Sequence, residues 1–446
     1  MKINDNSIIP KSEFSEIPKL TQRILNVTLG ELEKEGVFIF PNNLSEGEDL
    51  IQNDMILKSV DSFNQSTNLM GFIGMGSEEL TIKSRFSSGN DNYLLQYLLE
   101  KVLDMPNLLS LNSSSSEGKR LYNILVFLFP LYLKIAMRKG VFKTYVKNKY
   151  NDSNIKGVIN VSEHIRNNTP FLGKVAYTKR EYSYDNYLMQ LLRHTVEYIK
   201  SKPFGSKVLS TVREEVLMIT ETTKDFSYNN RTKVIHQNKD NQVNHAYFQE
   251  YRPLQKLSLM ILKQENQIFG SGHMKMHGLL FDGSWLWEEY INILVSSEFY
   301  HPNNKTRSGG QKLFSHNTGL IYPDFISHDD KNRIIVDAKY KPKENIGNKD
   351  YLQLVAYMYR FQSKTGFYVY PDDKSDNRKI LKLNKGSTYE KNVVEQNDIT
   401  VTKLGLVIPQ NIDDYQIFCN AMKKSEETLQ EAIFLKTDIF NDELEP

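Results

Sequence analysis

The sequence predicts a multidomain α/β (α+β) protein, and three observations support this fold class. The chain has 446 residues, too many for one ordinary core when a domain takes roughly 100–200 residues. Its composition, 39% hydrophobic and 25% charged, is that of a globular protein. From about residue 270 the apolar residues alternate between helical and strand periods, which is typical of an α/β arrangement.

The first stretch, residues 1–118, is predicted to be a mixed α/β region. A helix is expected over 20–35 and strands over 71–75 and 79–86, where apolar and polar side chains alternate. Residues 91–103 carry leucines on one helical face, so a second helix is expected there. The serine run at 112–118 has nothing to bury, which indicates an exposed loop or a domain boundary.

The second stretch, residues 119–264, is predicted to be mainly helical. Its longest apolar run, 124–133, is about half the length that spans a bilayer and contains Pro130, so it indicates a buried helix and no membrane partner. The expected helices and one strand-like segment cover 121–137, 155–161 (strand), 185–200, 210–223 and 247–264.

The third stretch, residues 265–446, follows a helix, strand, strand, helix, strand order. The expected elements are a helix at 284–296, strands that end at Asp324 and Ala338, a helix at 350–361 and a strand at 366–370. The acidic tail from residue 425 is expected to be a helix with a solvated charged face and three apolar residues packed inward, Leu429, Ile433 and Phe434.

Charge and cysteine content narrow the function classes. The net charge of +2 comes from 56 basic and 54 acidic residues, so any nucleic-acid affinity must come from local patches. One such patch, of Arg138, Lys139, Lys143 and Lys147, is either a contact surface or a solvated basic face. The single cysteine cannot form an internal disulfide, and no secretory signal opens the chain, so a cytoplasmic location is expected.

Two short segments carry the candidate chemistry, one around Asp324 and one containing Asp337 and Lys339. Asp337 and Lys339 share a strand face, since side chains alternate with period two. Thirteen positions separate Asp324 from Asp337, enough for a hairpin that brings both carboxylates together. The alternative is a solvated strand face with ordinary ion pairs.

Phosphodiester hydrolysis needs a cation that neutralises phosphate charge and activates water, and oxygen ligands suit Mg²⁺. Asp324, Asp337 and the main-chain carbonyl of Ala338 are the candidate ligands. Lys339 is the candidate for orienting water or stabilising negative charge. Gln353 and Tyr357 lie at i and i+4 on one helix face and can reach the same site, although an amphipathic helix alone also explains that spacing.

This combination resembles the PD-(D/E)xK nuclease superfamily, in the branch with a Gln-x-x-x-Tyr helix. The resemblance implies a restriction-endonuclease-like mixed sheet flanked by helices, and cleavage that depends on Mg²⁺, for which Mn²⁺ can substitute. It also implies an acidic residue on the preceding helix, where Glu288 is favoured over Glu289. Three basic residues on the following loop are candidate DNA-backbone contacts or a solvated surface: Lys305, Arg307 and Lys312.

Segments outside this motif extend the resemblance to roughly residues 70–410. They occur in the order 140–145, 156–159, 181–192 and 251–262, and together they resemble the McrC family, the nuclease subunit of McrBC-type restriction systems. The resemblance implies cleavage of double-stranded DNA and a McrB-like AAA+ GTPase ring as partner. It also implies that residues 1–264 dock into that ring and stimulate its GTP hydrolysis.

Two other readings stay open at this point. An autonomous repair or recombination nuclease would use the same residues without a motor, whereas a non-cutting adaptor of an AAA+ motor would be expected to lack a carboxylate or the lysine. The absence of a Walker motif agrees with an energy-using step on another chain. No segment indicates the DNA target or its methylation state.

Overall fold

The computed structural model groups the chain into two compact units. The discontinuous unit contains residues 1–110 and 273–446, and the middle unit contains residues 111–272. The residues described are 1–35, 37–41, 53–88, 92–102, 117–269, 276–302, 310–316, 318–373, 378–388 and 391–438.

The first sheet of the discontinuous unit joins the two ends of the sequence. β11 (Met276–Asp282) pairs antiparallel with β6 (Leu69–Met75) and parallel with β3 (Val37–Phe40), and so completes a sheet of N-terminal strands. The order is β1-β7-β6-β11-β3, where β1 is Lys2–Asn4 and β7 is Glu78–Lys83. This grouping differs from the three predicted stretches, because β11 buries apolar side chains in the N-terminal core.

A smaller sheet and two short helices cover this core. The sheet has the order β2-β5-β4, and the helix predicted over 20–35 is two helices, α1 and α2. That single-helix prediction is wrong because Asn26 adopts φ 57°, which a continuing helix does not allow. The bounds are β2 (Ile8–Pro10), β4 (Leu57–Val60), β5 (Phe63–Ser66), α1 (Pro18–Ile24) and α2 (Leu29–Glu35).

Gly71 lies where β6 closely approaches the main chain of β11. It has φ +133°, and a Cβ placed there would lie 2.1 Å from the Leu279 carbonyl oxygen. Gly71→Ala is therefore expected to destabilise this sheet by about 3 kcal/mol, because it combines backbone strain with a clash against main chain. Scanning calorimetry should show a clearly lower melting temperature than for Gly76→Ala, since Gly76 has positive φ but nothing within 4 Å. Equal melting temperatures would contradict this reading.

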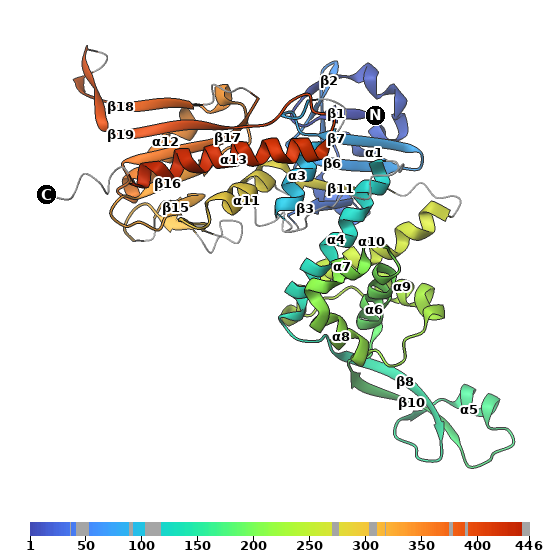
Figure 1. Cartoon of the computed structure of the whole chain (residues 1–446). Helices are drawn as coiled ribbons and strands as arrows, with labels where there is room; N and C mark the ends of the chain where they lie inside the picture. The colour runs from blue at the N-terminus through green and yellow to red at the C-terminus, as the bar shows by residue number, and fades with distance from the viewer. Residues whose placement is uncertain are drawn as a thin grey trace. The chain divides into compact units, whose positions relative to one another are not determined.

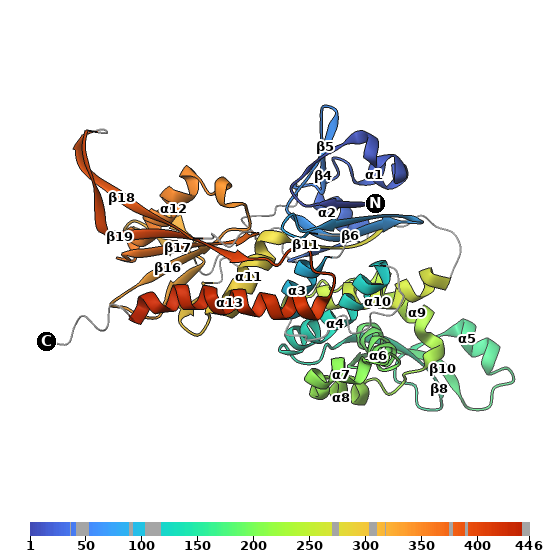
Figure 2. The same cartoon turned by 45° about the horizontal axis from the view of Figure 1, so that its top comes forward.

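The second sheet is mixed and is flanked by helices on both faces. Its order is β12-β15-β16-β17-β19-β18, with β16, β17 and β19 parallel and the other pairs antiparallel. α12 (Asn348–Arg360) lies on one face, and α11 (Gly283–Val295) and α13 (Tyr415–Asp438) lie on the other (Figure 2). The strands are β12 (Phe299–Tyr300), β15 (Phe325–Ser327), β16 (Ile334–Ala338), β17 (Thr365–Asp372), β18 (Arg378–Thr388) and β19 (Lys391–Val407).

The predicted C-terminal elements agree in order with this architecture. The expected helices at 284–296 and 350–361 correspond to α11 and α12, and the expected strand at 366–370 is part of β17. The tail prediction is confirmed for Leu429 and Ile433, which are buried, whereas Phe434 is only half-buried. α3 (Tyr93–Val102) packs against α11 and α13 and corresponds to the helix expected over 91–103.

The middle unit is a group of helices with one long hairpin. β8 (Thr144–Asp152) and β10 (Val175–Ser183) pair antiparallel and extend from the helices to α5 (Val161–Asn167) (Figure 1). The strand expected over 155–161 is limited to β9 (Val158–Ile159), which pairs with β10. The helices are α4 (Glu117–Met137), α6 (Tyr187–Lys200), α7 (Gly205–Leu209), α8 (Arg213–Thr222), α9 (Arg231–Asp240) and α10 (Tyr251–Phe269).

Three sequence predictions concern a membrane span, the serine-rich segment and the basic loop. Among the described residues, no helix combines the length and the apolar character that crossing a bilayer requires. Of the predicted loop at 112–118, residues 112–116 lie outside the described residues. The remaining two residues belong to α4, which begins at Glu117. Lys305 and Arg307 also lie outside the described residues, whereas Lys312 is in β13 (Gln311–Lys312), paired with β14 (Leu320–Ile321).

Candidate active site

Asp324 lies immediately before β15, so the prediction that a strand ends there is wrong. Pro323, which has no N–H to donate to a strand ladder, lies between the end of β14 at Ile321 and the start of β15 at Phe325. One carboxylate oxygen of Asp324 accepts a hydrogen bond from the Ala338 N–H at 2.8 Å. The predicted hairpin is present, because β15 pairs antiparallel with β16 and thereby carries Asp324 to the end of β16.

Asp337 and Lys339 lie together at that strand end. Asp337 is 1% exposed on β16, and its Oδ2 lies 2.7 Å from the Lys339 ammonium nitrogen. The other oxygen, Oδ1, is buried and has no hydrogen-bond donor among the described residues. Ile335, on the same face of β16, packs in the apolar cluster beneath α12. Asp337 is therefore buried and Lys339 half-buried, so the pair is not a solvated strand face.

The electrostatics of this cluster follow from two acids that share one ammonium group. Burial raises the pKa of Asp324 well above its usual value, and the carboxylates of Asp337 and Glu288 raise it further. Burial also raises the pKa of Asp337, although Lys339 opposes the shift. Burial disfavours the charge of Lys339, but Asp337 and Asp324 outweigh it and raise the pKa of the ammonium group. Lys339 therefore stays protonated at neutral pH.

Helix α11 presents one of its two adjacent glutamates to the cluster. Glu288 is buried and acts on the pKa of Asp324, whereas Glu289 is half-buried. The helix is held in place by Trp287, whose indole N–H donates to the Val369 carbonyl of β17 at 3.1 Å. Of the two predicted alternatives, Glu288 is the one that lies beside Asp324.

Helix α12 brings Gln353 and Tyr357 to the same site. The Gln353 amide donates a hydrogen bond to the Tyr357 hydroxyl at 2.7 Å, as expected for side chains at i and i+4. Tyr357 is 3% exposed. Burial raises the pKa of Tyr357 to about 12, to which the negative charges of Asp337 and Asp324 contribute. Its hydroxyl is therefore neutral and lies within the field of the two carboxylates.

Sequence reasoning missed two side chains that belong to this neighbourhood. His301 lies with Nδ1 2.9 Å from the Asp324 carbonyl oxygen and Nε2 3.7 Å from a Glu288 oxygen, and no local pattern indicated it. Lys341 forms two 2.8 Å contacts with both oxygens of Asp350 at the start of α12. The repeated lysine of Lys339-Tyr-Lys341 was the available signal for that second residue.

The oxygen atoms at the end of β16 are the ones that could bind a cation. No cluster of three or more His, Cys, Asp or Glu side chains suited to a metal ion occurs in the described part of the chain. The predicted ligand set is smaller, with two carboxylates and the main-chain carbonyl of Ala338. The buried Asp337 Oδ1 without a donor suits a hard cation, because leaving such an oxygen uncompensated is costly.

Comparison of the sequence with known protein families gives one match. The sequence profile of the family described as "McrBC 5-methylcytosine restriction system component" matches residues 64–371, more than half of the chain. No curated protein matches the chain.

Two solved structures from Thermococcus gammatolerans are similar to the chain. One is a chain of the half-complex from a tetradecameric assembly of McrB AAA+ hexamers with bound McrC. It has 15% identity and a TM-score of 0.46, over 97% of this chain and 99% of that one. The other, from the McrBC complex, has 16% identity and a TM-score of 0.30, over 66% and 87%. The family match carries the assignment and confirms the resemblance seen in the sequence: the chain belongs to the McrBC 5-methylcytosine restriction system component family.

Proposed function

We propose that this chain is the DNA-cutting subunit of a GTP-dependent McrBC-type restriction system, a PD-(D/E)xK endonuclease that hydrolyses phosphodiester bonds of double-stranded DNA. The observation that carries the proposal is the cluster at the end of β16, in which the buried Asp337 lies with the half-buried Asp324 and Lys339. Folding does not require a buried Asp337 carboxylate oxygen without a hydrogen-bond donor, whereas metal-assisted hydrolysis requires carboxylate oxygens that are free to bind the cation.

In this proposal Asp324, Asp337 and the Ala338 carbonyl hold Mg²⁺, or Mn²⁺ in its place. The bound ion supplies charge neutralisation at the phosphate and lowers the pKa of a water molecule. Lys339, which stays protonated, donates hydrogen bonds to the negative oxygens of the reacting phosphate. Glu288 adds a carboxylate beside Asp324, and Gln353 holds the Tyr357 hydroxyl at the rim of the site.

As the pH is lowered, cation affinity is expected to start falling at a higher pH than it does at ordinary carboxylate sites. The pKa values of Asp324 and Asp337 are raised, so in the metal-free protein both take up protons at a higher pH than the usual range near 4. Protons then compete with the cation, and affinity drops up to about tenfold per pH unit for each carboxylate below its pKa. Calorimetric titration with Mn²⁺ from about pH 8 to pH 5 checks this. Constant affinity over that interval would contradict it.

The partner in this proposal is a McrB-like AAA+ GTPase ring, and the middle unit offers a contact surface for it. The end of the β8–β10 hairpin carries several large apolar side chains in solvent, which is unusual for a surface without a partner. Their exposed fractions are 78% for Val158, 63% for Val161, 63% for Phe171 and 84% for Leu172. The basic patch named from the sequence is partly satisfied internally, since Lys139 lies 3.6 Å from Glu250 and Lys143 lies over two tyrosine rings.

Removing the apolar end of the hairpin is expected to uncouple the chain from its partner. The double substitution Phe171→Ser with Leu172→Ser should lower stimulation of the partner's GTP hydrolysis by at least about tenfold, since buried apolar anchors dominate interface energies. Leu352→Ser is the matched control, because Leu352 is 74% exposed on α12 in the other unit. Full stimulation by the double variant would rule out the hairpin as the contact.

The proposed function is tested by plasmid cleavage with the full chain. Methylated and unmethylated DNA are incubated with the chain and Mg²⁺, with or without the McrB-like AAA+ GTPase partner and GTP. Cleavage that needs both the partner and GTP supports the proposal and begins to define the target. Cleavage without them would favour an autonomous nuclease, and stimulated GTP hydrolysis without cleavage would favour a non-cutting adaptor.

A further inference from the structure

The segment that follows β16 depends on contacts outside its own sheet. β16 ends at Ala338, and beyond it the Lys339 N–H still donates to the Val369 carbonyl of β17 at 2.9 Å. The next carbonyl, that of Tyr340, accepts instead from the Arg85 guanidinium at 2.5 Å. Arg85 follows β7 of the N-terminal sheet, so a residue 255 positions away holds the main chain next to Lys339.

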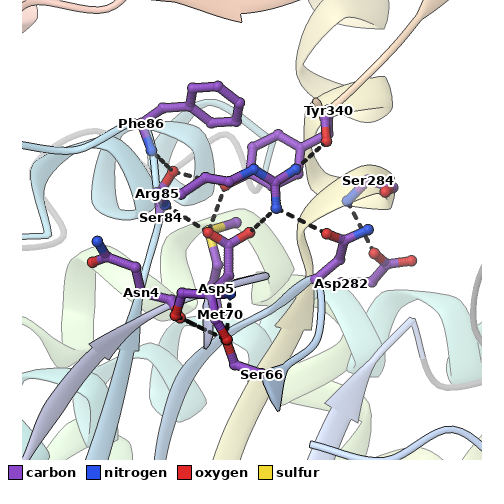
Figure 3. Close-up of polar contacts among 12 residues, drawn as sticks. Asn4, Asp5, Ser66, Met70, Ser84, Arg85, Phe86, Asp282, Ser284 and Tyr340 are labelled. Carbon is purple, nitrogen blue, oxygen red and sulfur yellow. Dashed lines mark hydrogen bonds and ion pairs between the residues drawn. The ribbon is translucent and has the colours of Figure 1, made fainter. Parts of the chain in front are cut away.

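Arg85 is itself fixed by buried partners. Its Nη1 lies 2.9 Å from Asp5 Oδ2, and its main-chain N–H donates to Asp5 Oδ1 at 2.6 Å (Figure 3). The same Nη1 lies 2.9 Å from Asn68 Oδ1. The Asp5 side chain is 0% exposed and that of Arg85 is 13% exposed. Burial raises the pKa of Asp5 to about 6 against the attraction of Arg85, so the pair is ionised at neutral pH. An ion pair with this burial is sensitive to the loss of either member.

The Tyr340 side chain is held as firmly as its carbonyl. Its hydroxyl lies 2.7 Å from Ser84 Oγ and 3.2 Å from Met70 Sδ, and the Arg85 guanidinium lies 4.7 Å from its ring centre. The ring also touches the start of α11, where a Cβ on Gly283 would come within 2.6 Å of it. Tyr340 therefore has little freedom to move relative to the N-terminal strands.

Tyr340 stands between the two lysines of the candidate site. Lys339 pairs with Asp337, and Lys341 pairs with Asp350. A shift of the Tyr340 main chain moves both ammonium groups, and misplacement of a reacting group by about 1 Å can cost 100-fold in rate. We propose that Arg85, held by Asp5, is a positioning residue that sets Lys339 for catalysis and so makes cleavage depend on the N-terminal strands. This inference rests on the proposed nuclease function.

The test uses Arg85→Lys in the full-length chain. A lysine can still pair with Asp5, but its single ammonium cannot also hold the Tyr340 carbonyl and lie flat against the ring. Single-turnover cleavage at saturating DNA, with the AAA+ partner and GTP, is expected to fall roughly 10- to 100-fold, while DNA affinity stays unchanged and the chain stays folded. Amide hydrogen exchange in peptides covering residues 336–342 is expected to increase.

The matched control is Arg23→Lys, because Arg23 forms a 2.8 Å ion pair with Glu35 in the same N-terminal region, with 56% and 38% of the side chains exposed. It should change neither cleavage nor exchange. Unchanged exchange in Arg85→Lys would overturn the proposal, and so would faster exchange with an unchanged cleavage rate. A wild-type chain that does not cut would instead contradict the nuclease function, and the exchange measurement would still decide whether Arg85 holds this segment.

Discussion

Lys339→Ala should remove DNA cleavage while leaving the rest of the protein's behaviour intact. In the proposed mechanism this ammonium group stabilises negative charge that develops on the phosphate, and loss of one such donor costs about 100- to 1000-fold in rate. Lys339 contributes nothing to the ligand set, so Mn²⁺ affinity should stay the same or rise, because a positive charge 2.7 Å from Asp337 is removed. Stimulation of the partner's GTP hydrolysis should also persist.

The measurement is single-turnover cleavage with partner, GTP and Mg²⁺, alongside Mn²⁺ titration of each variant. Lys331→Ala serves as control, because Lys331 is an exposed lysine in the turn between β15 and β16. It should cut at the wild-type rate. Undiminished cleavage by Lys339→Ala would place the catalytic site elsewhere in the chain.

Asp337→Asn should remove both cleavage and cation binding. The substitution keeps the shape of the side chain but removes its negative charge, so the buried Asp337 carboxylate that would hold the cation becomes a neutral amide. Metal ions supply several kcal/mol of transition-state stabilisation, which corresponds to a loss of more than about 100-fold in rate. The fold should survive, since the amide oxygen can still accept a hydrogen bond from Lys339.

Mn²⁺ titration and single-turnover cleavage are again the measurements, with Asp398→Asn as the control, an exposed aspartate on β19 of the same sheet. The two active-site variants separate the roles: Lys339→Ala loses rate and keeps the cation, whereas Asp337→Asn loses both. Wild-type Mn²⁺ affinity in Asp337→Asn would show that the cation, if one is used, binds to other residues.

Local patterns in the sequence predicted those parts of the fold that are decided within one element. The helices α3, α6, α11 and α12 agree with their predicted ranges to within a few residues, because each carries an apolar face at helical spacing. The hairpin between Asp324 and Asp337 also followed from spacing alone. The approach of Asp324 to Asp337 therefore needed only short-range information, although the roles of both residues remain predictions.

Long polar strands escaped sequence reasoning for an identifiable reason. β8 alternates between half-buried and exposed positions along its whole length, and none of its residues is fully buried. β18, at the edge of the second sheet, is likewise exposed or half-buried where its side chains are described. Strands of this kind are stabilised by main-chain pairing with a partner strand, which leaves no apolar alternation in the sequence to find.

The sequence by itself determined the fold class, the family and the residues at the end of β16, since all three depend on residue type and short spacing. Tertiary structure alone decided that β11 completes the N-terminal sheet, that His301 contacts the Asp324 carbonyl, and that Arg85 holds Tyr340. Each of these depends on which distant surfaces are buried together. The sequence of a single helix or strand does not indicate which distant element it packs against, because burial is a property of the assembled core.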